Sequence, residues 1–452
     1  MKSIVSIVLF LFLLLTCPEI KTQSIYFPPL SGNQWESVTP SSLGWCTEKI
    51  DSLLNYLESK NTKAFLVLKN GRIVIEHYFG TFSADSIWYW ASAGKTLTAM
   101  LCGIAQQEGY INISDSSSKY LGAGWTSCQP GKEKLITIRN QLTMTTGLND
   151  NVVDPFCTLP SCLIYLTDAG SRWAYHNAPY TLLDKVIENS TGQTYNLYFN
   201  SRIKNRIGMN GIWLPSGFNN IYYSNARSVA RFGILILNKG VWNVDTLLHD
   251  TSYFNSMTNT SQNLNLSYGY LWWLNGKSSY MLPGTQFVFP GSWAPDAPDN
   301  MIAALGKSGQ ILNMVPGSGI VLVRLGNAPD TSFEITTHFN NQIWIRLNDI
   351  ICDPSSVKNL SSVSPQQFIL HQNYPNPFNP ETTFDYYIGK NGFVSLKIFN
   401  ILGKEVQSII NEYKNTGSYS VKWNASEFPG GAYLYRFSFD EIYKTGKLIL
   451  IK

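Results

Sequence analysis

The spacing of apolar side chains changes from helical to strand-like early in the chain. Apolar positions three and four residues apart predict a helix over 46–58. Two short apolar runs, 64–68 and 72–78, flank Asn70-Gly71, and Asn-Gly between such runs is the strongest local signal for a β-hairpin. This part of the chain is therefore expected to form a helix followed by two paired strands.

The same spacing rules predict further elements up to residue 351. Helices are expected at 141–144, 181–188, 228–237 and 333–351, strands at 301–305, 310–315 and 320–325, and loops over a pocket at 271–298. A helix and a hairpin first, three antiparallel strands and a helix last, and helices inserted between them predict an α+β domain. Its sheet would join both ends of the domain.

Beyond Cys352 the pattern changes to a polar segment and then to alternation. Residues 353–367 are rich in Ser, whereas apolar and polar residues alternate over 368–452 between Gly and Pro residues. Period two with such turn signals predicts a small Ig-like β-sandwich. We therefore expect a first domain over 24–352, a linker over 353–367 and a second domain over 368–452.

Residues 1–23 have the charge and the length of a secretory signal peptide. Lys2 precedes an apolar run over 4–15, which is too short to span a bilayer. Cleavage is expected between Lys21 and Ser24, with lipid attachment at Cys17 as the alternative. The signal predicts export, and therefore an environment in which disulfides form.

Six of the seven cysteines lie beyond the expected signal peptide, and an even number suits disulfide pairing. Cys157 and Cys162 are close enough to pin a loop. Cys46 and Cys352 bracket the first domain and could tie its two ends together, although the sequence leaves the connectivity open. Cys102, inside a helical run, is expected to be a buried thiol.

The composition excludes some classes of function. Charged residues make up 14% of the 452 residues, and 34 basic residues stand against 30 acidic ones for a net charge of +4. They form no basic stripe, which argues against nucleic-acid binding. The five histidines are scattered and include no His-Glu-x-x-His pair, so we expect neither a metal site nor a cofactor.

A serine followed three residues later by a lysine occurs four times. At Ser92 an aromatic run gives way to a helix-favouring segment, in which Lys95 would share a helix face with Ser92. A serine with a lysine beside it is a pattern of nucleophilic catalysis. The other three matches begin at Ser116 in a polar, exposed loop, Ser201 in a surface turn and Ser355 in the linker.

A nucleophile of this type also needs a group that takes its proton and backbone donors for the oxyanion. Tyr-x-Asn, a common second element, occurs seven times, at Tyr175 among others. The third element is a basic residue followed by Ser or Thr and then Gly. Lys307-Ser308-Gly309 lies at the start of a predicted strand and fits this element. Lys444-Thr445-Gly446 lies inside the terminal β-sandwich, so we do not expect it to belong to the site. His176 suggests a Ser-His-Asp triad, but the chain has no Gly-x-Ser-x-Gly elbow, and we expect this histidine in the pocket wall.

The first domain resembles the beta-lactamase-related serine hydrolases of the class C type, which include esterases, peptidases and penicillin-binding enzymes. The matching stretches are Ser92-Ala93-Gly94-Lys95, the run from Gln141 to Leu148, Tyr175-His176-Asn177 and Gly306-Lys307-Ser308-Gly309-Gln310. Ser171-Arg172-Trp173 and Met144 replace a Pro-Gly and a His that are usual in the family. The resemblance covers about residues 45–351 and implies a beta-lactamase/transpeptidase-like fold, with an antiparallel sheet flanked by helices and a helical subdomain.

The resemblance implies roles for the matching residues. Ser92 would be the acylated nucleophile, with Lys95 and Tyr175 as the general base. The substrate-binding set would consist of Asn177, Lys307, Ser308, Gly309 and Gln310. The backbone N–H groups of Ser92 and Gln310 would form the oxyanion hole. The implied function is cleavage of an ester or amide in a small-molecule or peptide acyl substrate; the alternative is a surface protein that binds penicillin or peptidoglycan with slow turnover or none.

The tail resembles the C-terminal sorting domain of the bacterial type IX secretion system. It opens with Gln372-Asn373-Tyr374-Pro375-Asn376-Pro377-Phe378-Asn379-Pro380 and continues with Ile401-Leu402-Gly403 and Pro429-Gly430-Gly431-Ala432-Tyr433. The resemblance implies passage through the periplasm to the cell surface or the medium, with the type IX machinery as the partner of residues 368–452. We expect the protein to be a monomer.

Overall fold

The structure, a computed structural model, describes residues 24–329, 336–352, 368–370, 373, 375–440 and 442–452. The expected signal peptide over 1–23, with Cys17, and the expected linker over 353–367, with Ser355, lie outside the described residues. The same holds for the first residues of the helix that was expected to begin at Phe333.

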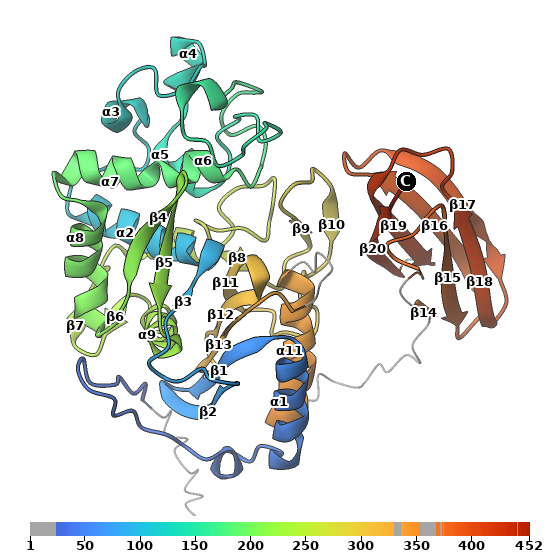
Figure 1. Cartoon of the computed structure of the whole chain (residues 1–452), viewed down its shortest axis with the longest axis horizontal. Coiled ribbons are helices and arrows are strands. Elements are labelled where there is room, and N and C mark those ends of the chain that lie inside the picture. Colours follow the sequence, from blue (N-terminus) through green and yellow to red (C-terminus); the bar gives the residue numbers. More distant parts are fainter. Residues whose placement is uncertain (1–23, 330–335, 353–367, 371–372, 374, 441) are drawn as a thin grey trace, which may run out of the picture.

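A six-stranded antiparallel sheet forms the centre of the first domain (Figure 1). Its order is β2 (Arg72–Tyr78), β1 (Thr62–Lys69), β13 (Ile320–Gly326), β12 (Gln310–Val315), β11 (Ile302–Gly306) and β8 (Trp273–Leu274). The predicted hairpin and the three later strands are confirmed, and β1 pairs with β13, so the sheet joins early and late parts of the chain. Asn70 and Gly71 both have positive φ, as a tight Asn-Gly hairpin turn requires.

Helices cover both faces of this sheet (Figure 1). They are α9 (Ala226–Leu237) on one face, and α1 (Ile50–Ser59) and α11 (Thr336–Ile351) on the other. α9 lies so close to the sheet that a Cβ on Gly233 would come within 2.5 Å of the Val321 side chain. On the opposite face the side-chain amides of Asn313 and Asn340 are 2.7 Å apart. The predicted helices at 46–58 and 228–237 thus exist with shifted starts, and the helix expected at 333–351 exists over its described residues, Thr336–Ile351.

Short helices and small sheets fill much of the remaining chain. They are β3 (Trp88–Tyr89), α2 (Lys95–Gln107), α3 (Ser118–Leu121), α4 (Pro130–Glu133), α5 (Ile138–Leu142), α6 (Asn177–Thr181), α7 (Leu183–Thr191), α8 (Tyr195–Phe199), β4 (Ile212–Ser216), β5 (Asn219–Ser224), β6 (Val241–Trp242), β7 (Asp245–Thr246) and α10 (Thr251–Met257). The helix that was expected at 181–188 is α7, which begins two residues later than predicted, and a separate short helix, α6, precedes it. Pro179 lies in the first turn of α6, where a missing N–H costs no hydrogen bond.

Three local predictions were wrong. Ser201 lies in a π-helix, Asn200–Lys204, and not in a surface turn. Ser116 is half-buried and forms a β-bridge with Thr137, so its loop is not simply exposed. The segment 271–298, expected as loops, contains β8 at the sheet edge and a hairpin of β9 (Ser279–Met281) and β10 (Val288–Pro290). In the second and third cases the pairing of segments, which local spacing does not report, decides the structure.

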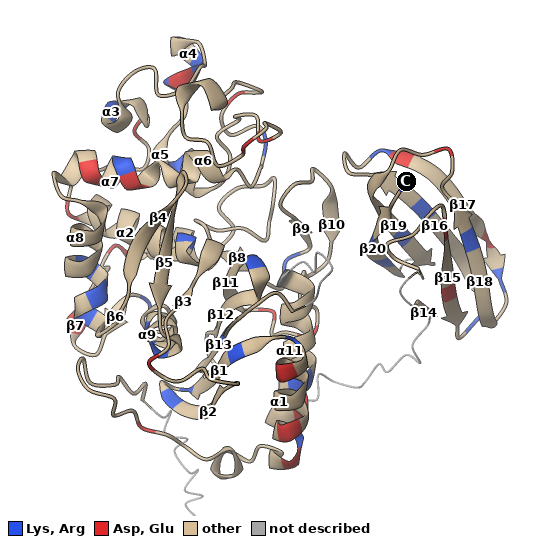
Figure 2. Ribbon diagram, in the orientation of Figure 1, with Lys and Arg blue, Asp and Glu red and all other residues tan. Residues whose placement is uncertain are grey.

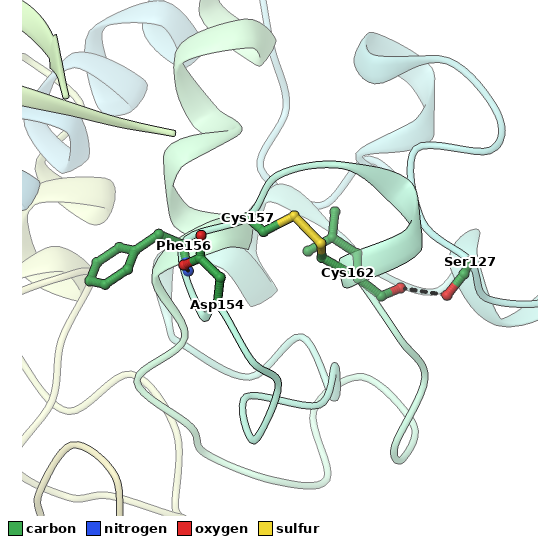
Figure 3. Close-up of a disulfide and its surroundings, with 6 residues drawn as sticks. Ser127, Asp154, Phe156, Cys157 and Cys162 are labelled. Atoms are coloured by element: carbon green, nitrogen blue, oxygen red, sulfur yellow. Dashed lines mark hydrogen bonds between the residues drawn. A yellow bond between two sulfur atoms is a disulfide. The ribbon is translucent and has the colours of Figure 1, made fainter. Parts of the chain in front are cut away.

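Two disulfides join the cysteine pairs that the sequence suggested. Cys46–Cys352 links residues 306 positions apart, and such a long loop removes much entropy from the unfolded chain. Cys157–Cys162 closes a short loop beside the hydrogen bond from Ser127 to the Leu163 carbonyl (Figure 3). Cys102 is a buried free thiol, as predicted.

The second domain consists of two antiparallel sheets around a separate apolar core. One sheet has the order β14 (Phe368–Leu370), β15 (Glu381–Ile388) and β18 (Gly417–Asn424); the other has the order β17 (Glu405–Lys414), β16 (Gly392–Asn400), β19 (Gly431–Phe439) and β20 (Ile442–Leu450). Alternate residues of the strands face this core. The arrangement is consistent with the β-sandwich that the alternation predicted.

Charged side chains are dispersed over both domains. Figure 2 shows lysine and arginine interspersed with aspartate and glutamate, without a basic stripe. None of the helices among the described residues combines the length and the apolar character that a bilayer span requires.

Candidate active site

Ser92 lies at a tight turn between a short strand and a helix. β3 pairs with β5, and the Trp90 N–H continues this pairing by donating to the Tyr222 carbonyl over 2.8 Å. Ala91 then adopts φ +48°, a left-handed conformation that is uncommon outside glycine. The 3-10 turn Ala91–Gly94 leads directly into α2. The turn therefore holds Ser92 in a fixed place at the start of α2.

The Lys95 amine lies between Ser92 and Asn177. Its Nζ is 3.0 Å from the Ser92 Oγ and 2.8 Å from the Asn177 Oδ1. The rings of Tyr180 and Tyr175 lie 4.4 Å and 5.1 Å from the same Nζ, measured to the ring centroids. Only 4% of Lys95 is exposed. The lysine is thus enclosed by two hydrogen-bonding partners and two aromatic rings.

Burial makes Lys95 a base at neutral pH. It lowers the pKa of Lys95 from the usual 10.5 to about 7, because the ammonium form loses its hydration. A substantial share of the molecules therefore carries a neutral amine at pH 7. A neutral amine within hydrogen-bonding distance of a serine hydroxyl can take the hydroxyl proton, so this pair has the chemistry of nucleophile and general base.

The Tyr175 phenol stays protonated at neutral pH. Burial raises the pKa of Tyr175 to about 12, and a hydrogen bond with Ser92 lowers it to a smaller extent. The ring lies between aromatic neighbours, stacked with Trp273 at 6.2 Å and edge-on to Tyr268 at 6.2 Å. A protonated phenol can donate or relay a proton. Of the two groups expected to share the role of base, Lys95 therefore has the better-matched pKa.

The run from Gln141 to Leu148 supports the segment that carries Tyr175 and Asn177. Met144, with φ +59°, accepts a hydrogen bond of 2.9 Å from the Ala174 N–H. The Gln141 Nε2 donates to the Pro179 carbonyl over 2.6 Å. Both ends of the segment 174–179 are thereby held. Because Met144 acts through its backbone carbonyl, its difference from the usual family residue leaves this support intact.

The end of β11 approaches the Ser92 turn closely. A Cβ on Gly306 would lie 2.4 Å from the Trp90 carbonyl oxygen, so this approach requires glycine. A 3-10 turn, Lys307–Gly309, follows, and Ser308 adopts φ +63° within it. Lys307 is exposed. The predicted Lys-Ser-Gly stretch therefore follows directly on the contact with the turn of Ser92.

Gln310 and Arg324 fix this corner of the sheet. The Gln310 side chain is fully buried; its Nε2 donates to the Gly326 carbonyl over 2.7 Å and its Oε1 accepts from the Gly326 N–H over 3.1 Å. The buried Arg324 Nη1 donates to the carbonyls of Ser308 and Gly309 over 2.7 Å and 3.0 Å. The Gln310 side chain thus stabilises the sheet by bonding to Gly326, and the part of Gln310 that could contact a substrate is its backbone.

His176 is buried and neutral. Only 2% of it is exposed, and neither ring nitrogen has a hydrogen-bond partner among the described residues. Burial, the largest effect, lowers the pKa of His176 to about 4, although Asp150 acts in the opposite direction. Asp150 is itself paired with Arg172 at 2.7 Å. This arrangement does not provide the histidine base of a Ser-His-Asp triad.

Two surface cavities lie elsewhere. The lining of one, of about 280 Å³, includes Trp35, Arg227 and Arg231, and the lining of the other, of about 440 Å³, includes Phe254 and Lys277. None of the predicted site residues lines either cavity. Chemistry, rather than cavity size, therefore locates the candidate site, because a buried amine in hydrogen-bonding contact with a serine hydroxyl could act as a base.

The structure brings Ser92, Lys95 and Asn177 into direct contact and places Tyr175 beside them. Sequence motifs did not indicate two residues of the site: Tyr180, whose ring lies beside the Lys95 Nζ, and Arg324, which donates to carbonyls of the Lys307–Gly309 turn. Arg324 carried a usable signal, because a lone charge in an apolar strand implies buried partners. Within the part of the chain that the structure describes, no group of three or more His, Cys, Asp or Glu could hold a metal ion.

Comparisons with known proteins match both parts of the chain. A family model described as Beta-lactamase matches residues 58–341, and one described as Secretion system C-terminal sorting domain matches residues 372–452. Protein flp of Staphylococcus aureus is 25% identical over 181 residues, which cover 35% of this chain and 36% of that protein. An uncharacterized protein of Alkalihalophilus pseudofirmus is 24% identical over 303 residues, 58% of this chain and 82% of that protein. The chain spans about a third of the length of the first curated relatives it matches.

Solved structures share the fold. A putative beta-lactamase from Bacteroides dorei has a TM-score of 0.54 at 16% identity, covering 68% of this chain and 100% of that one. A putative 6-aminohexanoate-dimer hydrolase from Bacillus anthracis has a TM-score of 0.53 at 20% identity, with 71% and 89% covered. The predicted beta-lactamase/transpeptidase-like fold is confirmed. The sorting domain at the other end indicates export to the cell surface or the medium.

Proposed function

Because the chain belongs to the beta-lactamase family, we propose that it is an exported serine hydrolase that cleaves an ester or amide bond through an acyl-enzyme on Ser92. One observation carries the proposal: the buried Lys95 Nζ lies 3.0 Å from the Ser92 Oγ, and burial lowers the pKa of Lys95 to about 7. An ordinary lysine is almost fully charged at neutral pH and cannot act as a base there. Lys95 can.

Acylation starts with transfer of the Ser92 hydroxyl proton to the Lys95 Nζ. The Oγ forms a bond to the carbonyl carbon of the substrate, and the carbonyl π electrons move to its oxygen. The backbone N–H groups of Ser92 and Gln310 donate to this oxyanion, and each donor of this kind contributes about 3 kcal/mol in hydrolases. When the intermediate collapses, the leaving group departs with a proton from Lys95, relayed by the Tyr175 hydroxyl.

Deacylation repeats these steps with water as the nucleophile. Lys95, neutral again, takes a proton from the water as its oxygen attacks the acyl carbon. The bond to the Ser92 Oγ breaks, Ser92 recovers its proton, and the acid product leaves. Asn177 orients Lys95 throughout, because its Oδ1 lies 2.8 Å from the Nζ.

The substrate is a small-molecule or peptide acyl compound. Lys307 is exposed at the corner beside the Ser92 turn, where its ammonium group can attract a carboxylate on the substrate. Residues 1–23 would direct the chain to the periplasm, and residues 368–452 would engage the type IX machinery. The hydrolase would act as a monomer at the cell surface or in the medium.

A substrate panel tests the proposed function. The full chain is assayed with p-nitrophenyl esters, nitrocefin and peptides that end in D-Ala, alongside Ser92→Ala and the matched control Ser201→Ala. We expect turnover of at least one class, loss of that turnover in Ser92→Ala and its retention in Ser201→Ala. Turnover that survives in Ser92→Ala would refute the proposal, and acylation without product release would favour the binding-protein alternative.

A further inference from the structure

One aromatic residue of the sorting domain is buried on the face that should be exposed. In β16 the side chains of Val394, Leu396 and Ile398 enter the core of the domain, so by the two-residue period Phe393 and Phe399 belong to the outward face. Phe393 is 45% exposed, as expected, but Phe399 is only 8% exposed. The cover over Phe399 must come from outside the core of this domain.

The β9–β10 hairpin of the first domain supplies that cover. The Phe287 ring lies 5.7 Å from the Phe399 ring, and both belong to an apolar cluster that is separate from the two domain cores. The cluster consists of Leu282, Phe287, Phe289 and Phe399, with Tyr280 and Leu434 packed against it. In Figure 1 the hairpin extends toward the sorting domain.

Polar groups fix the register of this contact. The Arg436 guanidinium of β19 lies over both rings, 5.4 Å from the centroid of Phe287 and 5.5 Å from that of Phe399. The Thr285 Oγ1 donates to the Ile401 carbonyl over 3.1 Å. A Cβ on Gly403 would lie 3.3 Å from the Phe287 ring, so the turn after β16 also fits against the hairpin.

The covered hairpin borders the segment that carries Tyr175. The Gln286 Nε2, next to Phe287, donates to the Trp173 carbonyl over 3.1 Å. The Trp173 ring lies 6.3 Å from the Tyr175 ring. One hydrogen bond and one ring contact therefore connect the covered hairpin to Tyr175.

We infer that the outward face of the β17-β16-β19-β20 sheet is a docking surface whose partner is the β9–β10 hairpin of the same chain. Separation of the two domains then uncovers an aromatic surface beside the candidate active site. The contact involves far fewer residues than a stable interface between separate proteins. It forms because both surfaces belong to one chain, which makes their association intramolecular. The inference concerns an interaction surface and goes beyond the proposed hydrolase activity.

Hydrogen–deuterium exchange of the full chain tests this docking. Phe399→Ser removes the central contact from the sorting domain, and Phe393→Ser makes the same change on the same face of the same strand outside the contact. We expect exchange over 282–290 to rise about tenfold in Phe399→Ser and to stay at the wild-type rate in Phe393→Ser. Equal hairpin exchange in the two variants would overturn the inference.

A reciprocal variant guards against a folding defect in the sorting domain. Phe287→Ser changes the hairpin alone, and we expect faster exchange over 399–403 with unchanged exchange over the core residues 394–398. Unchanged exchange over 399–403 in this variant would also overturn the inference. Because these readouts are exchange rates rather than turnover, they do not depend on whether the proposed hydrolase activity is found.

Discussion

Replacement of Lys95 by methionine should abolish acylation of Ser92 and stabilise the fold. Methionine keeps much of the length of the side chain and removes the amine that burial disfavours when it is charged. Lys95 is 4% exposed, and its pKa falls from 10.5 to about 7. The native state therefore binds this proton less tightly than the unfolded state does, and the difference is a cost to folding.

The size and the sign of this cost follow from the pKa. At pH 7 the unfolded lysine is charged and the native one is about half neutral, so the cost is at most about 4 kcal/mol. Loss of the hydrogen bonds to Ser92 and Asn177 offsets about 1 kcal/mol each. We therefore expect Lys95→Met to gain about 2 kcal/mol at pH 7.

The gain should shrink as the pH rises. Because the native pKa lies below the unfolded one, the cost is largest below pH 7 and disappears above 10.5. Over that window the free energy of unfolding of the wild type should approach that of the variant by at most about 1.4 kcal/mol per pH unit. The difference between the two proteins isolates Lys95 from other groups that titrate in the same range.

Urea unfolding of both proteins at pH 7.0 and 9.5 measures the free energy of unfolding of the first domain. Labelling with a fluorophosphonate measures acylation. A variant that is less stable than the wild type at pH 7, or a stability difference that does not change with pH, would show that Lys95 is not held near neutrality by burial. Retained labelling of the variant would show that Lys95 is not the base.

Three further outcomes follow from the site. The acylation rate of the wild type should rise with pH through a midpoint near 7, as Lys95 loses its proton; a rate that is flat between pH 5 and 9 would contradict this. Tyr180→Leu removes the ring 4.4 Å from Nζ that favours the charged amine, so the midpoint should move to lower pH by about half a unit to one unit, whereas Tyr180→Phe should leave it in place. Gly306→Ala forces a Cβ to within 2.4 Å of the Trp90 carbonyl and should slow acylation about 100-fold by displacing the Ser92 turn; Gly131→Ala, at a glycine with open space around it, should label at the wild-type rate.

The sequence predicted the parts of the fold that depend on local pattern. The Asn70-Gly71 hairpin, the three strands over 302–326 and the apolar helix Ala226–Leu237 all appeared where spacing and turn chemistry placed them. The pair Cys46–Cys352 also formed, because the two ends of the domain meet beside the sheet. Local pattern sufficed for the hairpin, the strands and the helix, since each of these elements carries its own periodic or turn signal.

Other features depend on partners that are distant in the sequence. The motif around Ser92 suggested the nucleophile, but no motif or spacing indicated Tyr180, whose ring lies 4.4 Å from the Lys95 Nζ. Gln310 was expected to face the substrate, whereas its side chain reaches Gly326 on the neighbouring strand. The β9–β10 hairpin escaped prediction because its strands are short and its cover comes from another domain.

Peptide mass spectrometry after incubation with a fluorophosphonate or a penicillin shows directly whether Ser92 is the nucleophile. Ser116→Ala, which removes another serine that is followed by a lysine at the same spacing, is the matched control. We expect a single covalent adduct on the peptide that contains Ser92, present in the wild type and in Ser116→Ala and absent in Ser92→Ala. An adduct on another residue, or no adduct with either reagent, would contradict it.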